Sequence, residues 1–425
     1  MSSSPAIERQ HVDSSKENNR YLSPEAKRRL TNLTVIHIAP PWLPVPMSLR
    51  EYGGVETVID DLLDPLRRLG IQRQIVYGHA ANDVLSGNSI DTRTPSSIRA
   101  ERDYFKLFES QPEVADEVYR KYVKQVYDEI TAAFETKMLD PQNTVIHDHT
   151  VVGRMHAKRL AKYGVPVIAT EHERVNRDEG DIREIYNAAV SPNLFSVAIS
   201  LDQLTSNPEL HWLGVIPHGI NLDNFEFAVE KAGDPELGNY GLFLGLVCKR
   251  KGTHHAVKAA QETNTPLIIA GPIEQTTASR THFEDEIAPH LSKKIRYIGA
   301  VGREERRTLL RDASWLAMLN EWEEPFGLVI VEALASGTPV VGRRRGSISG
   351  IVKDGVTGYV VEDPMDASEA VKKIMDTDNQ AMNQECRDVA EWEYSAATMS
   401  NRYARAYLEA IDIMQKRTPH RRNLL

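Results

Sequence analysis

The feature that most constrains the fold is an alternation of short apolar runs with amphipathic segments, which occurs twice along the 425 residues. The first run, LTVIHIA at 33–39, is almost continuously apolar and β-branched, as in a strand buried on both faces. A helical pattern follows over 55–69, Gly70 ends it, and a second apolar run begins at 74. This strand–helix–strand order predicts a parallel sheet covered by helices.

The same alternation continues to the end of the chain. In the first series we expect further strands at 144–147, 165–170, 194–199 and 214–217, with helices at 151–163 and within 101–137. In the second series we expect strands at 241–247, 267–270, 295–298, 315–319 and 339–341, and an apolar helix at 329–336. Two series of similar size predict two Rossmann-like domains.

Composition along the chain suggests where these domains begin and end. We expect a flexible polar leader at 1–30 with a short helix near 24–30, a first domain at 31–218, a polar and turn-rich linker at 219–240, a second domain at 241–394, and a C-terminal helix and tail at 395–425. The last periodic segment, 396–415, is typical of one long amphipathic helix.

Overall composition argues against several classes of protein. The net charge is -9, with 51 basic and 60 acidic residues, which disfavours nonspecific nucleic-acid binding. The two cysteines, Cys248 and Cys386, cannot form a disulfide framework, so a reducing cytoplasm is the expected location. The sequence contains no run of about 18 apolar residues, so no transmembrane segment is predicted. The polar N-terminus does not resemble a signal peptide.

The segment EWEEPFGLVIVEALASGTPVV at 321–341 carries the strongest functional signal. Pro325 fits the first position of a helix, where its missing N–H costs nothing. Eight helical residues advance about 12 Å and rotate about 800°, which places Glu324 and Glu332 broadly on one side. A ligand with a sugar, a phosphate and a ribose in sequence would match that spacing.

The free backbone N–H groups of Phe326, Gly327 and Leu328 would favour an anion at the helix N-terminus. An alternative interpretation treats Glu324 as an acidic cap and Glu332 as an ordinary carboxylate on a helix face. The surrounding motif favours the ligand interpretation.

This segment resembles the donor-binding signature of retaining GT-B glycosyltransferases, glycosyltransferase family 4. The similarity covers about 34–407 and is strongest over 241–361. Its other elements are APP at 39–41, YGGVE at 52–56, ATEH ending in His172, and HGI at 218–220. The resemblance implies an α/β fold of two Rossmann-like domains facing across an interdomain cleft, with the C-terminal helix returning to the first domain.

The resemblance also implies a role for each matching residue. Three are expected to be catalytic: Glu324 contacts hydroxyls of the donor sugar, His172 lies near the sugar, and Lys251 pairs with the donor diphosphate. The remaining donor-binding residues are Gly53 and Gly54 for close approach, Arg250 beside Lys251, the backbone donors of Phe326, Gly327 and Leu328, and Glu332 on the ribose.

The implied activity is transfer of a sugar from a nucleotide diphosphate sugar, above all a UDP-sugar, to an acceptor hydroxyl with retention. Such a hexosyltransferase uses the nucleotide sugar as co-substrate and needs no other cofactor and no obligate metal. The acceptor, whether small molecule, glycan or lipid-linked, has no signature here. Two alternatives stay open: a nucleotide-sugar 2-epimerase, which would isomerise the donor without acceptor, and a nucleotide-sugar-binding protein without turnover.

Two positions depart from the family pattern. Leu246 stands where the family usually has an arginine after the first strand of the second domain, and Lys249 or Arg250 could supply the missing cation. Gly350 stands where a family loop normally ends in glutamate. An altered donor or a weak enzyme would be consistent with both.

Other chemical motifs are weaker. His147 and His149 would share one face of a strand, but no third metal ligand is evident. His254 and His255 at a helix start are not expected to be ligands, and Cys248 has no base partner that would activate it. The arginines at 343–345 could contact a phosphate or an acceptor, but a basic triplet at the surface is the more common arrangement. The chain contains neither G-x-G-x-x-G nor a P-loop, which disfavours a dehydrogenase and a P-loop enzyme.

Overall fold

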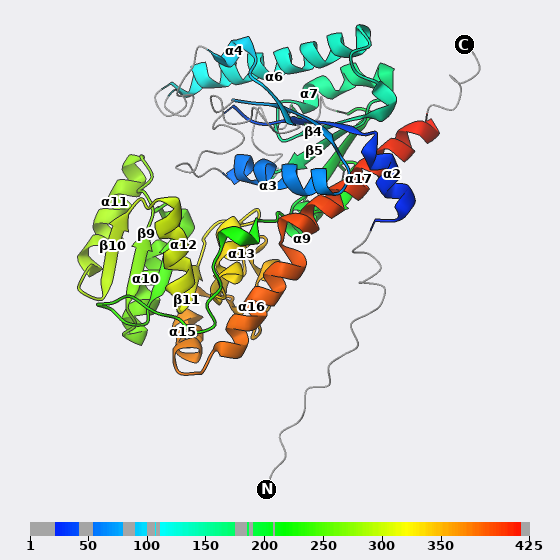
Figure 1. Ribbon diagram of the computed structural model, residues 1–425. Helices are drawn as coiled ribbons and strands as arrows, with labels where there is room; N and C mark the ends of the chain where they lie inside the picture. Colours follow the sequence, from blue (N-terminus) through cyan, green and yellow to red (C-terminus); the bar gives the residue numbers. More distant parts are fainter. Residues whose placement is uncertain are drawn as a thin grey trace.

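The computed structural model describes residues 22–41, 54–79, 90–99, 107, 111–174, 185–186, 190–206 and 209–417. Each series of alternating elements forms one parallel sheet, and the two sheets lie in separate bodies joined by the segment after residue 215 and by the C-terminal helices (Figure 1). The prediction of two Rossmann-like domains is therefore confirmed.

The first sheet has the strand order β3-β2-β1-β4-β5-β6-β7, and every neighbouring pair is parallel. Its strands are β1 (Thr34–Ile38), β2 (Arg73–Tyr77), β3 (Ile90–Arg93), β4 (Thr144–Asp148), β5 (Val167–Glu171), β6 (Leu194–Ala198) and β7 (Trp212–Val215). The order reverses between β1 and β4, and such a reversal opens a crevice at the carboxyl ends of the strands. The edge strand β3 was not predicted because its sequence, IDTR, is too polar.

Helices cover both faces of this sheet. They are α2 (Pro24–Thr31), α3 (Gly54–Arg68), α4 (Ser96–Arg99), α6 (Pro112–Glu135), α7 (Arg154–Ala157) and α9 (Leu201–Ser206), with 3-10 turns η1 (Pro141–Asn143), η2 (Lys158–Tyr163) and η3 (Leu222–Asn224). Ile36 and Ile38 of β1 pack against α6, whereas Val35 packs against α3. This alternation follows from the two-residue period of a strand. The helix expected at 151–163 is α-helical only at Arg154–Ala157 and continues as η2.

The second sheet has the order β10-β9-β8-β11-β12-β13, again entirely parallel. Its strands are β8 (Gly241–Leu244), β9 (Leu267–Ala270), β10 (Ile295–Gly299), β11 (Trp315–Met318), β12 (Val340–Arg343) and β13 (Gly358–Val361). The order reverses between β8 and β11, which creates a second crevice. The segment expected as a strand over 241–247 is strand only as far as Leu244.

Helices also cover both faces of the second sheet. They are α10 (Thr253–Thr263), α11 (Thr277–Glu286), α12 (Arg303–Asp312), α13 (Leu328–Ala335), α14 (Ile348–Ile351), α15 (Ala367–Met375) and α16 (Gln380–Glu393), with 3-10 turns η4 (Lys249–Lys251), η5 (Ala288–His290) and η6 (Pro364–Asp366). The helices α10 and α15 share one apolar cluster with the sheet, and α13 and α16 share the other.

The last helix, α17 (Ala396–Arg417), returns to the first domain, as the resemblance implied. It runs beside α2 and α3 (Figure 1), and Tyr403 and Tyr407 are fully buried there. The Tyr403 hydroxyl lies 2.8 Å from Thr170 Oγ1, and the Tyr407 hydroxyl lies 2.7 Å from His147 Nδ1. The helix α17 therefore packs on the first domain, although it directly follows α16 of the second domain.

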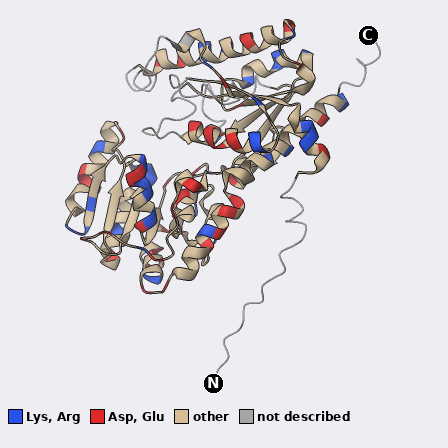
Figure 2. Ribbon diagram, in the orientation of Figure 1, with Lys and Arg blue, Asp and Glu red and all other residues tan. Residues whose placement is uncertain are grey.

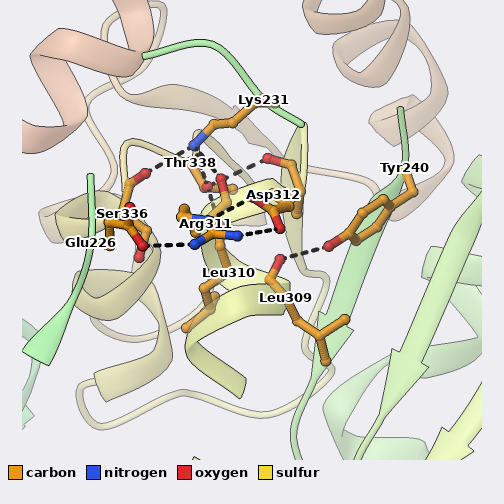
Figure 3. Close-up of polar contacts among 10 residues, drawn as sticks. Glu226, Lys231, Tyr240, Leu309, Leu310, Arg311, Asp312, Ser336 and Thr338 are labelled. Carbon is orange, nitrogen blue, oxygen red and sulfur yellow. Dashed lines mark hydrogen bonds and ion pairs between the residues drawn. The ribbon is translucent and has the colours of Figure 1, made fainter. Parts of the chain in front are cut away.

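The segment between the domains is fixed to the second domain by Lys231. Its ammonium donates to the carbonyl oxygens of Arg311 and Ser336 at 3.0 and 2.9 Å and to Thr338 Oγ1 at 2.9 Å (Figure 3). Ser336 is the C-cap of α13, so the lysine satisfies a carbonyl that the helix leaves unpaired. Arg311 adds an ion pair with Glu226. The segment between the domains is thus anchored at the C-terminal end of α13, and the N-terminal end of the same helix faces the interdomain space.

In the view of Figure 2, the helices of both domains carry acidic as well as basic residues. Among the helices that the structure describes, none combines the length and the apolar character needed to span a bilayer.

Candidate functional site

A pocket of about 400 Å³ lies between the two domains. From the first domain it is lined by Gly54, Val55, His172, Glu173, Ile199 and His218; from the second it is lined by Leu244, Gly245, Leu246, Arg250, Lys251, Arg306, Met318, Trp322, Glu324, Pro325, Phe326, Gly327, Leu328 and Val329. Most of these residues follow strands at the two crevices. Another hollow, of about 590 Å³ between α2 and α17, contains none of the predicted site residues.

The pocket brings Lys251 and Glu324 into direct contact. Lys251 Nζ donates to Glu324 Oε2 at 2.7 Å, and the two side chains are 22% and 8% exposed. Asn320 Nδ2 and Trp322 Nε1 donate to the same oxygen at 2.6 and 3.1 Å. Three donors therefore hold one carboxylate oxygen in place, which fixes the position of the carboxylate expected to face the sugar.

Trp322 also orders two neighbouring cations, Arg250 and Lys251. The Lys251 ammonium and the Arg250 guanidinium lie 4.7 and 5.0 Å from the centre of its ring, within the range of a cation–π interaction. Arg250 is held further by Glu274 at 3.0 Å. The predicted donor-binding residues Arg250 and Lys251 thus lie side by side at the pocket wall.

The helix at the acidic motif begins later than predicted. The structure places the N-cap at Gly327, with φ of 82°, and the first helical residue at Leu328, so the proposal that Pro325 opens the helix is wrong. A left-handed residue cannot continue a right-handed helix, and glycine adopts this conformation without strain. Of the segment from Glu324 to Glu332, only the part from Leu328 onward is helical. Phe326, Gly327 and Leu328 nevertheless line the pocket.

Glu332 lies one step behind the pocket. Its side chain is 4% exposed and forms an ion pair with Arg306, whose Nε donates at 3.0 Å. Arg306 lines the pocket and Glu332 does not. The structure therefore adds a cation that the sequence analysis missed, because Arg306 is one of several arginines in the strongly charged helix α12.

His172 is the centre of a row of three histidines. Its Nε2 lies 2.9 Å from His149 Nδ1, and its Nδ1 lies 3.3 Å from His218 Nε2. Burial lowers the pKa of His172 to about 3, and burial likewise holds the pKa values of His149 and His218 well below the usual range. All three rings are neutral near pH 7. A polar contact from His172 to a sugar requires one of these two bonds to open.

The row reaches the other domain through an aromatic contact. The His218 ring meets the Phe326 ring edge-on, with the centroids 4.9 Å apart. Phe326 in turn is tied to the loop after β12, because Ser347 Oγ donates to its carbonyl oxygen at 2.8 Å. The histidines and the loop before α13 are therefore packed into one interdomain contact.

Of the two glycines that were predicted to bind the donor, Gly53 and Gly54, the structure describes only Gly54. Gly53 lies outside the described residues. Gly54 is the first residue of α3 and lines the pocket, and a Cβ added there would meet no atom of the described residues within 4 Å. The space next to Gly54 is therefore open in the structure.

Both departures from the family pattern can now be located. Gly350 is exposed on the short helix α14 and lies away from the pocket lining, whereas Leu246 is half-buried and lines the pocket. The arginines at 343–345 lie near the surface, where Arg344 pairs with Glu362 and Arg345 with Glu323.

The position of Leu246 allows a gain-of-binding test. Leu246→Arg is expected to leave the protein folded and to tighten UDP binding about tenfold, since a charge-assisted contact to a phosphate contributes about 1.4 kcal/mol or more. Isothermal titration with UDP measures the change, and Leu246→Met is the control that adds no charge. A variant that unfolds would show that Leu246 is a core residue, and an unchanged Kd would show that no phosphate reaches it.

The strand histidines have a third neighbour that the sequence did not reveal. His37 on β1 joins His147 and His149, with one ring nitrogen of each within 4.8 Å of the others. Both nitrogens of His147 are already engaged, by Thr170 and Tyr407. The cluster contains no carboxylate to offset the charge of an ion in this buried place, which favours a packed histidine core over a metal site.

Residues 224–391 match a family model described as glycosyl transferases group 1. The chain is 28% identical over 223 residues to a phosphatidyl-myo-inositol mannosyltransferase of Mycobacterium leprae, covering 49% of this chain and 56% of that protein. It is 27% identical over 260 residues to a D-inositol 3-phosphate glycosyltransferase of Corynebacterium kroppenstedtii, covering 54% and 57%. The chain thus spans somewhat over half the length of these two relatives.

Solved structures resemble the whole architecture. A sucrose-phosphate synthase from Thermosynechococcus elongatus superposes with a TM-score of 0.70 at 17% identity, covering 89% of this chain and 99% of that one. HepE from Anabaena, in complex with UDP and glucose, gives 0.65 at 15% identity, covering 89% and 100%. These similarities confirm the two-domain GT-B fold that the sequence predicted.

Proposed function

We propose that this protein transfers a sugar from a nucleotide diphosphate sugar, most of all a UDP-sugar, to an acceptor hydroxyl with retention of anomeric configuration. The observation that carries the proposal is the Lys251–Glu324 pair in the interdomain pocket, held by Asn320 and Trp322. Support comes from the family match, which contains this pair, and from relatives whose names are those of glycosyltransferases.

The main chemical demand of the reaction is stabilisation of the departing diphosphate. Arg250, Lys251 and Arg306 bring positive charge to the pocket wall, and the N-terminus of α13 opens beside them. Fixed charges aimed at the leaving group act most strongly in a site that excludes water. Closing the two domains on donor and acceptor would supply both exclusion and proximity.

The arrangement around Glu324 bears on the route to retention. A double displacement would use a free carboxylate oxygen as nucleophile. Here the three hydrogen bonds to Oε2 orient the carboxylate, and they leave Oε1 able to accept from a sugar hydroxyl. We favour front-face attack, in which the departing phosphate takes the acceptor proton, because of the resemblance to retaining GT-B glycosyltransferases, and we assign Glu324 to the hydroxyls of the donor sugar.

A thermal-shift screen with UDP, GDP, ADP and TDP sugars tests the donor, because a ligand that binds only the folded state raises the melting temperature. NMR of the product then reports the anomeric configuration. Isomerisation of the donor without acceptor would instead indicate a 2-epimerase. Binding without hydrolysis or transfer across a broad acceptor panel would indicate a nucleotide-sugar-binding protein.

Glu332→Ala is expected to weaken UDP binding about 10- to 100-fold, because a hydrogen bond to a charged group contributes about 1.5–3 kcal/mol. The loss has two sources: the carboxylate assigned to the ribose disappears, and Arg306 loses the partner that orients it. Titration calorimetry measures the Kd. Glu304→Ala, in the first turn of α12 and with a side chain that is 83% exposed, is the control. Equal Kd values for both variants and the wild type would mean that the nucleotide is placed wrongly.

A further inference from the structure

A second group of potential ligands lies outside the pocket lining. His254 and His255 occupy the first turn of α10, and Glu321 follows β11. Glu321 Oε1 lies 3.3 Å from His254 Nε2 and 3.2 Å from His255 Nε2, and one ligand atom of each residue lies within 4.8 Å of the others. The sequence analysis did not expect these two histidines, which lie at a helix start, to be ligands.

The two separations from Glu321 fit a tetrahedral ion. With ligand bonds of about 2.0–2.2 Å, neighbouring ligand atoms around a tetrahedral zinc ion are about 3.3–3.6 Å apart. The two distances to Glu321 Oε1 agree with this value to within about 0.1 Å. The histidine side chains are 17% and 16% exposed and Glu321 is 32% exposed, so an ion and a water in the fourth position could enter.

The donor set of the group suits a transition metal. A neutral imidazole offers one ring nitrogen as a ligand, and Glu321 offers a carboxylate oxygen. Among nearby charges, Arg343 at His255 and Lys249 at Glu321 oppose a cation, and Asp363 at His255 favours one. Two imidazoles with one carboxylate suit zinc, whereas magnesium prefers an all-oxygen shell.

We propose that His254, His255 and Glu321 bind one zinc-class divalent ion. The Glu321 N–H donates to the Arg250 carbonyl oxygen at 2.9 Å, so the ion would fasten the loop after β11 to the start of α10. Both segments adjoin the donor pocket, through Arg250 and Lys251 on one side and Glu324 on the other. The ion would therefore have a structural role, independent of whether the proposed reaction is right.

Metal binding itself is the readout of the test. Chelator-treated protein is dialysed against Zn²⁺, the bound metal is counted, and Co²⁺ is substituted to record the visible absorption of a tetrahedral site. One ion per chain is expected. His254→Ala, His255→Ala and the nearly isosteric Glu321→Gln are each expected to weaken binding by about 100-fold or more, because even outer-shell changes cost about 10- to 100-fold.

His290→Ala serves as the control, since the side chain of this exposed histidine hydrogen-bonds to Gln261 and lies outside the proposed ligand group. Circular dichroism melting confirms that every variant is folded, and Glu321→Gln keeps the test valid if a histidine variant unfolds. The proposal is overturned if the wild type binds no stoichiometric Zn²⁺ or if Glu321→Gln binds it as tightly. It is also overturned if His37→Asn, at the other histidine cluster, abolishes binding while Glu321→Gln retains it.

Discussion

Lys251→Ala is expected to lower kcat by roughly 10²- to 10³-fold, the loss seen when a single preorganised electrostatic donor is removed from an active site. Lys251 is the cation that lies against Glu324 in the pocket, and the proposed reaction needs positive charge where the diphosphate departs. The protein is expected to stay folded, because Glu324 keeps the hydrogen bonds from Asn320 and Trp322. Initial rates at saturating donor measure the effect.

Two further variants decide how Lys251 acts. Lys258→Ala removes an exposed lysine from α10 and controls for the change in net charge. Glu324→Gln, alone and combined with Lys251→Ala, completes a double-mutant cycle. If Lys251 only orients Glu324, the double variant is no slower than Glu324→Gln. If Lys251 acts on the diphosphate, it is slower still. A Lys251→Ala enzyme within about threefold of the wild type would contradict both roles.

The sheets were predictable because their strands are buried on both faces. The run at 33–39 contains β1, and the prediction that 396–415 forms one helix corresponds to α17. Polar or short elements were harder to predict. The IDTR sequence of β3 lacks an apolar pattern, and its strand pairing depends on β2 rather than on its own residues.

The loop before α13 shows where local rules fail. Proline is well suited to the first turn of a helix, which made Pro325 a reasonable start. The chain instead turns through Gly327 in the left-handed region, and this turn orients the Phe326 carbonyl toward Ser347. Such a turn depends on the loop after β12, which is distant in sequence, so the propensity of Pro325 was overridden by tertiary contacts.

Contacts between side chains of different helices and strands could also not be predicted from the sequence. Arg306 and Glu332 are 26 positions apart, and nothing distinguishes Arg306 from the other arginines of α12 until the two helices pack. His37 reaches His149 only because β1 and β4 are neighbours in the sheet. The residues of a motif were therefore easier to predict than the side chains from other elements that hold those residues in place.

Arg154→Met is expected to lower the free energy of unfolding of the first domain by about 3–5 kcal/mol, because it leaves a buried carboxylate without its cation. Arg154 and Glu171 are 2% and 3% exposed, and Nη2 donates to Glu171 Oε1 at 2.7 Å. The same nitrogen donates to Ser196 at 2.6 Å, and the guanidinium lies 4.6 Å from the Tyr186 ring centre. Urea unfolding, followed by a probe in the first domain, measures the loss.

Two further variants distinguish the effect of the unpaired charge on Glu171 from the effect of the contacts that Arg154 loses. Arg154→Met with Glu171→Gln removes both charges and is expected to recover part of the loss, whereas Arg159→Met breaks an exposed pair with Asp128 and costs only about 0–1 kcal/mol. A loss below about 1 kcal/mol for Arg154→Met alone would show that Glu171 is solvated or neutral in the folded protein.

The same variant tests whether this ion pair positions the candidate site. Glu171 ends β5 and immediately precedes His172. Gln203 Nε2 donates to the carbonyl oxygen of Glu171 at 2.6 Å. If Arg154 serves only stability, Arg154→Met at low temperature retains the wild-type kcat and KM. If Arg154 also fixes the end of β5, His172 shifts relative to His149 and His218. Turnover then falls in the folded variant, while UDP binding at the second domain is unchanged.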